Sequence, residues 1–142
     1  MSQSEQTSRL RVLHLDDFDE FLEEFQAIFS QDLDITSLQD PVEALALLER
    51  ESFDAIVVDY EMPEMDGLAF MRAVKEKWPL LPVLFCTGQG SEEVARRAFM
   101  SGAADYFVKD FSFFIDREKL LHSLSRAVNL RNAEEGLQEE RR

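Results

Sequence analysis

The sequence predicts an α/β fold in which five parallel strands alternate with five helices. Two observations carry this prediction. Short apolar runs of strand length recur along the chain, and a segment with helically spaced apolar residues follows each of them. Residues typical of turns and helix starts separate the two kinds of segment. Alternation at this spacing favours a parallel sheet with right-handed connections and helices on both faces.

Five segments are predicted as strands. Residues 53–59 contain the apolar run from Ala55 to Val58, which is typical of a strand buried on both faces. Residues 32–38 are less apolar, which favours a position at the edge of the sheet. The other three predicted strands are residues 9–15, 80–87 and 104–109.

The helices follow from periodicity and from residues that favour helix ends. The first is predicted from apolar residues at helical spacing with acids on the other face: Phe18, Phe21, Leu22, Phe25, Ile28 and Phe29. The other four starts carry residues that cap a helix or fit its first position: Asp40-Pro41, Asp66, Ser91 and Asp116. Gly102 is predicted to end the fourth helix. The polar tail after Val128 continues the last helix in character, with Gly136 as a weak point.

Length and composition predict one domain. The chain has 142 residues, of which 45% are apolar, and this is enough for a sizeable core. No apolar run approaches the ~20 residues of a membrane span, and residues 1–8 are polar, so a soluble cytoplasmic protein without membrane contact is expected. The lone Cys86 excludes an internal disulfide and is expected to be a small buried strand residue.

The charge balance is strongly acidic. The net charge is −14, from 15 Lys and Arg against 29 Asp and Glu. This argues against direct binding of nucleic acid, because such binding needs a basic surface. It suits a site that collects a divalent cation, although a well-solvated surface accounts for most of the excess equally well.

Three carboxylates fall where predicted strands end. Asp16 and Asp17 follow the first strand, and Asp59 ends the third. If these two strands are adjacent, the three acids meet in one cleft, at the rim where open α/β folds keep their sites. Their repulsion raises their proton affinity unless a cation neutralises them, and Mg²⁺ prefers such oxygen ligands. Asp59 is therefore predicted to be a nucleophile that accepts a phosphoryl group.

Two further polar residues end neighbouring predicted strands. Lys109 can neutralise one phosphoryl oxygen, and Thr87 can donate a hydrogen bond to another. Each residue also has a simpler interpretation: Asp16 and Asp17 as a helix cap, Lys109 as a solvated charge, and Thr87 as an ordinary strand-end hydroxyl. Together they favour a phosphoryl-transfer site, because all of them lie at C-terminal strand ends.

Several short motifs together resemble the receiver domain of two-component response regulators. The motifs are Leu15-Asp16-Asp17, Asp59-Tyr60-Glu61-Met62-Pro63-Glu64-Met65-Asp66-Gly67, Phe85-Cys86-Thr87-Gly88, Gly102-Ala103-Ala104-Asp105-Tyr106 and Val108-Lys109. The resemblance extends over residues 9–128. It implies a flavodoxin-like (βα)5 doubly wound sheet with the strand order 2-1-3-4-5 and with helices on both faces.

The resemblance also implies a phosphoacceptor and a metal site. Asp59 would be the phosphoacceptor. Mg²⁺, or another divalent cation such as Mn²⁺, would bind Asp17, Asp59 and the backbone carbonyl of Glu61 directly. Asp16 would bind the cation through water.

The same resemblance implies a switch and its partners. Thr87 and Lys109 would hold the phosphoryl oxygens, and Tyr106 would turn inward as Thr87 moves. The phosphoryl group would come from the phosphohistidine of a histidine kinase or phosphotransfer domain. The protein would not be an enzyme beyond its own phosphorylation and dephosphorylation. The face formed by the fourth helix, fifth strand and fifth helix would then engage a partner protein, an output domain or a second copy.

One position departs from the family pattern. Asp110 follows Lys109, where receiver domains usually carry a proline after a cis peptide bond. A cis bond without proline costs roughly 2.5–4 kcal/mol, so a trans bond and a reshaped loop are predicted. Phe111, Phe113 and Phe114 in that loop would either cap the core or form a docking patch.

The predicted organisation is a flexible tail (1–8), a receiver domain (9–128) and a charged helical extension or linker (129–142) to a domain not present here. Two other functions remain open. One is a carboxylate-nucleophile phosphohydrolase, because Glu61 lies two residues after Asp59 and can act as acid or base. The other is a docking module independent of phosphorylation, against which the full set of site residues argues.

Overall fold

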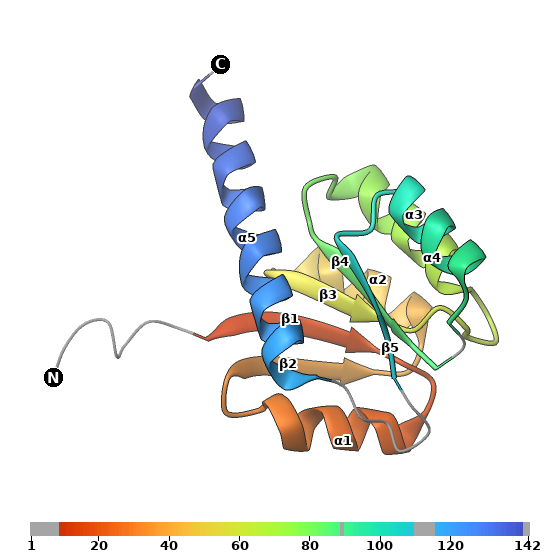
Figure 1. Ribbon diagram of the computed structural model, residues 1–142. Helices are drawn as coiled ribbons and strands as arrows, with labels where there is room; N and C mark the ends of the chain where they lie inside the picture. Colours follow the sequence, from red (N-terminus) through yellow and green to blue (C-terminus); the bar gives the residue numbers. More distant parts are fainter. Residues whose placement is uncertain (1–8, 89, 110–115, 141–142) are drawn as a thin grey trace, which may run out of the picture.

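The computed structural model describes residues 9–88, 90–109 and 116–140 (Figure 1). Within them, five parallel strands form one sheet in the order β2-β1-β3-β4-β5. This order and the edge position of the second strand are as predicted. The strands are β1 (Leu10–Leu15), β2 (Leu33–Leu38), β3 (Ala55–Val58), β4 (Val83–Thr87) and β5 (Asp105–Val108).

Five helices cover the two faces of the sheet (Figure 1). On one face, α1 and α5 bury three phenylalanines and three aliphatic residues against the strands: Phe21, Phe25, Phe29, Leu120, Leu124 and Val128. On the other face, α2, α3 and α4 bury a second cluster that includes Leu47, Phe70 and Met71. The helices are α1 (Asp19–Phe29), α2 (Pro41–Arg50), α3 (Gly67–Lys77), α4 (Glu92–Met100) and α5 (Arg117–Glu140).

The helix ends confirm most of the predicted caps. The Asp66 side chain accepts from the backbone N–H of Ala69 at 2.9 Å, and the Ser91 hydroxyl accepts from Val94 at 3.1 Å. Asp40 and Asp116 accept in the same way at the starts of α2 and α5. Gly102, just after α4, has a φ of 107°, which few other residues adopt.

The start of α1 differs from the simpler interpretation of its two acids. Phe18, not an aspartate, occupies the N-cap position. Asp16 Oδ1 accepts a hydrogen bond from the backbone N–H of Phe18 at 2.9 Å, so it shapes the turn ahead of the helix. The simpler interpretation of Asp16 and Asp17 as caps of α1 is therefore wrong.

All five strands begin later than predicted, and the difference is largest in β3 and β4. β4 begins at Val83, because Pro79 and Pro82 lack the N–H that a ladder needs and Leu81 donates its own to Trp78 at 3.1 Å. β3 begins at Ala55, after a buried Phe53 that packs against the core without joining the ladder. Each of these two strands is shortened mainly at its amino end, and its carboxyl end lies within one residue of the prediction.

Helix α5 runs to Glu140, and its last turns project beyond the sheet (Figure 1). Arg131 fixes the helix to the start of β3, because its Nη1 donates to the carbonyls of Phe53 at 2.9 Å and Asp54 at 3.3 Å. Leu130 and Leu137 are exposed. In the described part of the chain, no helix is long and apolar enough to cross a bilayer.

Two predictions concern residues outside the described part of the chain. They are the trans peptide bond between Lys109 and Asp110, and the packing of Phe111, Phe113 and Phe114. Both stay predictions, as does the flexible tail over residues 1–8.

Candidate functional site

The backbone ladder places two acids side by side at the carboxyl end of the sheet. Leu15 and Val58 are register partners on β1 and β3, and Asp16 and Asp59 follow them directly. The N–H of Asp59 donates to the carbonyl of Leu15 at 3.0 Å, and the N–H of Asp16 donates to Leu38 on β2 at 3.1 Å. The position of each carboxylate therefore follows from strand pairing.

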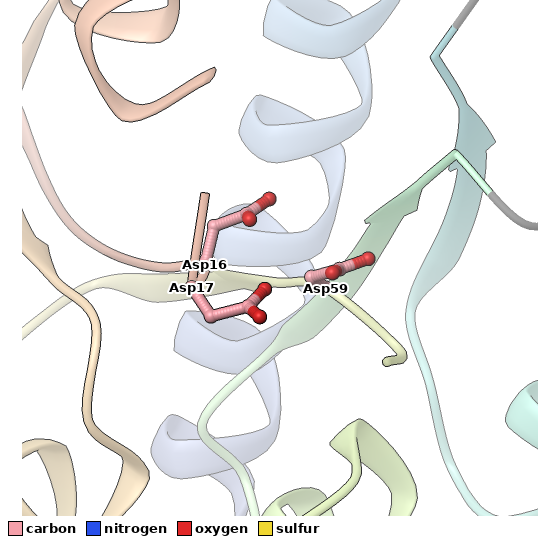
Figure 2. Close-up of side chains that lie close together, drawn as sticks. All are labelled: Asp16, Asp17 and Asp59. Atoms are coloured by element: carbon pink, nitrogen blue, oxygen red, sulfur yellow. The ribbon is translucent and has the colours of Figure 1, made fainter. Parts of the chain in front are cut away.

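Asp17 completes a cluster of three carboxylates. One oxygen from each of Asp16, Asp17 and Asp59 lies within 4.8 Å of the others. Figure 2 shows their side chains at the ends of the two strands, pointing to the same side. Asp16 and Asp59 are buried, with 0% and 8% of their surface exposed, whereas Asp17 is exposed.

The neighbouring strands bring Thr87 and Lys109 to the same place. The N–H of Lys109 donates to the carbonyl of Thr87 at 3.0 Å, so the two strand ends are paired. The Lys109 ammonium is 7% exposed and donates to Asp16 Oδ2 at 2.7 Å. The Thr87 side chain is buried and lies close enough to Asp59 to lower the pKa of that carboxyl. The structure thus gathers the predicted strand-end residues around Asp59.

These residues line an open cleft of about 730 Å³. Its walls also include Glu61, which is exposed, and the turn through Met62 and Pro63. Among the described residues that line the cleft, Lys109 is the one cation. Five acids therefore share the cleft with a single positive charge: Asp16, Asp17, Asp59, Glu61 and Asp66.

Tyr106 lies beside the cleft rather than in its wall. It is the register partner of Phe85, and the two ring centroids are 6.5 Å apart. Its hydroxyl oxygen is buried, and a Cβ on Gly90 would lie 3.4 Å from it. Burial raises the pKa of the Tyr106 hydroxyl. The ring is therefore packed between the sheet and the segment that leads into α4.

The shortage of positive charge changes the proton affinity of the acids. Burial, then the nearby charge of Asp16, raises the pKa of Asp59 to about 6, although Lys109 and the Thr87 hydroxyl act against this. Burial also raises the pKa of Asp16, against the opposing effect of its bond to Lys109. A further cation nearby would stabilise the ionised form of both Asp16 and Asp59.

Two other titratable groups near the cleft belong to the core. Burial raises the pKa of the Cys86 thiol to about 12, so it stays protonated. Burial, with help from the charge of Lys109, lowers the pKa of His14 to about 3, so its imidazole stays neutral at physiological pH. The prediction that Cys86 is a small buried strand residue is confirmed.

The structure adds Gly67, a residue that the sequence analysis named only within a motif. A Cβ on Gly67 would lie 2.6 Å from the carbonyl oxygen of Asp59 and from the Phe85 ring. The N–H of Gly67 donates to the carbonyl of Tyr60 at 2.7 Å. Glycine is needed here because α3 begins in contact with the backbone of the central acid. The Asp-Gly pair was visible in the sequence, but this contact was not.

The donor set fits a divalent cation. Carboxylate oxygens are the preferred ligands of Mg²⁺, which is usually held by one or two carboxylates together with water and phosphate. Asp59 Oδ1 is buried and accepts no hydrogen bond from the described residues. Asp17 offers a second carboxylate on the open side of the cleft. The unsatisfied oxygen and the crowding of acids both favour a bound cation.

The family of the chain follows from comparison with known proteins. Residues 12–125 match the family model described as the response regulator receiver domain. The chain therefore belongs to the receiver domain family of the response regulators of two-component signalling.

Two curated relatives are regulators that are longer than this chain. The chain is 32% identical over 104 residues to the DNA-binding transcriptional regulator NtrC of Salmonella typhimurium, which covers 73% of this chain and 21% of NtrC. It is 31% identical over 128 residues to the response regulator protein PilR of Pseudomonas aeruginosa, covering 89% of this chain and 28% of PilR. The chain thus spans 21% and 28% of the length of these two relatives.

Solved structures share the fold over almost their whole length. The chemotaxis response regulator CheY4 of Vibrio cholerae aligns with a TM-score of 0.73 and 28% identity, covering 84% of this chain and 99% of that one. A response regulator receiver domain protein from Clostridium thermocellum aligns with a TM-score of 0.78 and 24% identity, covering 87% and 98%. The latter likeness concerns the fold alone.

Proposed function

We propose that the protein is a signalling switch that accepts a phosphoryl group on Asp59. The observation that carries this proposal is the position of Asp59, a carboxylate with a raised pKa, within 4.8 Å of two further acids at the floor of an open cleft. One of its oxygens is buried without a hydrogen-bond donor among the described residues. Membership of the receiver family supports the same assignment.

The reaction transfers a phosphoryl group from a histidine nitrogen of the donor protein to a carboxylate oxygen of Asp59. A carboxylate oxygen of Asp59 forms a bond to phosphorus, and the bond from phosphorus to a histidine nitrogen of the donor breaks. The electron pair of that bond stays on the imidazole. The donor is a histidine kinase or phosphotransfer domain, and later attack by water on the acyl phosphate returns Asp59 to its free form. Such transfers depend mostly on positioning and on neutralising charge.

The metal ligands are the acids of the cluster. Asp17, Asp59 and the backbone carbonyl of Glu61 would hold Mg²⁺ or Mn²⁺ directly, and Asp16 would hold it through water. A cation bound there neutralises the carboxylates and the incoming phosphoryl oxygens. The exposed position of Asp17 and the burial of Asp16 are consistent with this division.

Lys109 and Thr87 are proposed to hold the phosphoryl oxygens. The Lys109 ammonium is fixed on Asp16 at 2.7 Å and faces the cleft, and an ammonium can donate three hydrogen bonds. The Thr87 side chain already lies close enough to Asp59 to lower its pKa, so it needs only a small movement to reach a group on that carboxylate. That movement would leave space beside β4, which Tyr106 is proposed to fill.

The output is proposed to pass through α4, β5 and α5. This face carries exposed apolar side chains of Phe99 and Val108. It would engage a partner protein, a second copy or an output domain, with residues 9–128 acting as the receiver and 129–142 as the link. The setting proposed for this exchange is the cytoplasm. The switch works by shifting the balance between two conformers.

The test is incubation with acetyl phosphate and Mg²⁺, followed by measurement of the intact mass. Wild type is expected to gain one phosphate, and Asp59→Asn none. Removal of Mg²⁺ with EDTA should abolish the gain. Phosphate addition that persists in Asp59→Asn would contradict the assignment, and multiple turnover of a generic phosphate ester would favour a phosphohydrolase that uses Glu61.

A further inference from the structure

The ammonium of Lys109 has a second buried neighbour besides Asp16. Its Nζ lies 3.8 Å from the centroid of the Phe21 ring, in addition to the 2.7 Å hydrogen bond to Asp16 Oδ2. Phe21 is fully buried and Lys109 is 7% exposed, so little water separates the two side chains. A cation this close to a ring face is attracted by the ring quadrupole, most strongly where water is excluded.

The fold holds the Phe21 ring firmly in this position. Phe21 lies in the first turn of α1, where its N–H donates to the carbonyl of Phe18 at 3.1 Å. The His14 ring contacts it edge-on, with 5.4 Å between the centroids. His14 in turn stacks on Phe25 at 4.0 Å. The ring below the ammonium is thus backed by a continuous aromatic stack and is not free to swing away.

An aromatic ring suits this position because it attracts the ammonium without neutralising it. Lys109 is already paired with Asp16, and a carboxylate in place of Phe21 would add a second ion pair that competes with a phosphoryl group for its charge. An aliphatic side chain would leave part of the buried ammonium without any favourable partner. The ring therefore holds Lys109 while leaving its positive charge available to the cleft.

We propose that Phe21 is a positioning residue, whose ring face holds the Lys109 ammonium at the floor of the cleft, within reach of a phosphoryl group on Asp59. This inference rests on the proposed phosphoryl transfer. It adds an aromatic residue of α1 to a site whose other residues lie at, or just after, the carboxyl ends of strands. The role belongs to the electron-rich face of the ring and not to the volume of the side chain.

The first measurement needs neither metal nor phosphate. The chain has only four lysines, so a spectrum of protein labelled at lysine Cε is simple, and Lys109→Arg identifies the signal. We expect the Hε protons of Lys109 to be shifted upfield by the ring current, and Phe21→Leu to move them toward the other three. The matched control is Phe29→Leu, because Phe29 is also fully buried on α1 but lies about two turns further along. An unshifted Lys109 signal in wild type would overturn the contact.

The second measurement separates the ring face from its volume. Phe21 is replaced by phenylalanines carrying one, three or five fluorines, which weaken the negative face while changing the shape little. The rate of phosphate addition from acetyl phosphate is expected to fall in steps, by about tenfold with five fluorines. The same series at Phe29 should change the rate by less than about twofold. Unfolding in urea, measured on every variant, shows that each one is folded.

The outcomes distinguish this inference from the function on which it rests. If wild type takes up phosphate but fluorination at Phe21 leaves the rate unchanged, or lowers it no more than at Phe29, the positioning role is wrong and the function stands. If wild type takes up none, the proposed function is wrong, and the positioning role for that reaction is wrong with it. In that case the NMR shift still decides whether the ring holds the ammonium.

Discussion

The two ends of the sheet differ in how well their charged side chains are paired and in how deeply they are buried. At the amino end, Arg11 donates from its backbone to Asp54 at 2.7 Å and from its side chain to Glu51 at 2.9 Å. Arg131 bonds there to the carbonyl of Phe53. These cations are half-exposed and each has an oxygen partner. Charge at this end therefore serves to fix chain segments to one another.

At the carboxyl end, charge is buried and only partly neutralised. Asp16 and Asp59 share the cleft with Asp17, and Lys109 is its one cation among the described residues. A fold selected for stability alone would not leave a buried carboxylate with a pKa of about 6. The contrast supports the proposal that the unsatisfied end is the functional one, and matched changes at both ends can test it.

The largest effect is expected from removing the cation of the cleft. Lys109→Met should slow phosphate addition by about a hundredfold, because a charged hydrogen bond to a phosphoryl oxygen is worth up to about 3 kcal/mol. Arg131→Met at the amino end should lower the free energy of unfolding by about 1 kcal/mol and leave the rate almost unchanged. Intact mass against time gives the rates. Equal slowing by the two changes would remove the distinction between the two ends.

The next effect concerns stability and pH in the absence of metal. Because the folded pKa of Asp59 is raised to about 6 from 3.8, the folded state binds this proton more tightly than the unfolded state. The stability that protonated Asp59 contributes to the fold is therefore lost as the pH rises from about 4 through about 6. Asp59→Asn should raise the free energy of unfolding by about 2–3 kcal/mol at pH 8, and by progressively less as pH falls toward 4.

Urea unfolding in EDTA at several pH values measures this effect. Asp54→Asn is the control from the amino end, where the carboxylate accepts from the N–H of Arg11. That change should give no gain at pH 8. An Asp59→Asn protein that is no more stable than wild type at pH 8, or whose gain does not depend on pH, would show that the buried charge is already well compensated.

A smaller effect is expected from magnesium. At about ten times its dissociation constant, Mg²⁺ should stabilise the wild-type fold by about 1.4 kcal/mol, which raises the Tm by several degrees. Asp17→Asn should lose most of this shift, and Asp54→Asn should keep it. Thermal unfolding at matched ionic strength is the measurement. A shift that survives Asp17→Asn would place the cation elsewhere.

The smallest effect is expected in the part of α5 that projects beyond the amino end of the sheet (Figure 1). Gly136 is inside α5, and a Cβ there would meet nothing within 4 Å. Gly136→Ala should stabilise the protein by at most about 0.5–1 kcal/mol through helix propensity. The rate of phosphate addition should stay the same. A change in that rate would mean that the end of α5 is coupled to the cleft.

The main site could be predicted because it depends on strand order more than on side-chain detail. Parallel strands bring their carboxyl ends to one edge, so acids after two adjacent strands must meet. The meeting of Asp16 and Asp59 therefore followed from the apolar runs ahead of them together with the strand order that the resemblance implied. Asp66 and Ser91 were predictable as caps for a similar reason, because capping depends on residues three positions apart.

Contacts between distant side chains could not be predicted in this way. The Phe21 ring below Lys109 depends on the angle at which α1 leaves the sheet, and helical spacing showed only that Phe21 is a core residue. The hydrogen bond from Arg131 to the Phe53 carbonyl joins residues 78 positions apart. The polar stretch around Arg131 has no periodic pattern of apolar residues that could have indicated it. The close approach of Gly67 to Asp59 was hidden for the same reason.

The most direct test is to trap the phosphorylated residue chemically. Borohydride reduces an acyl phosphate to an alcohol, so a phosphorylated aspartate becomes homoserine, which tandem mass spectrometry locates in the sequence. After treatment with acetyl phosphate and Mg²⁺, homoserine is predicted at position 59 and nowhere else. Homoserine at position 17 or 66, or none in a protein that carries phosphate, would contradict the account.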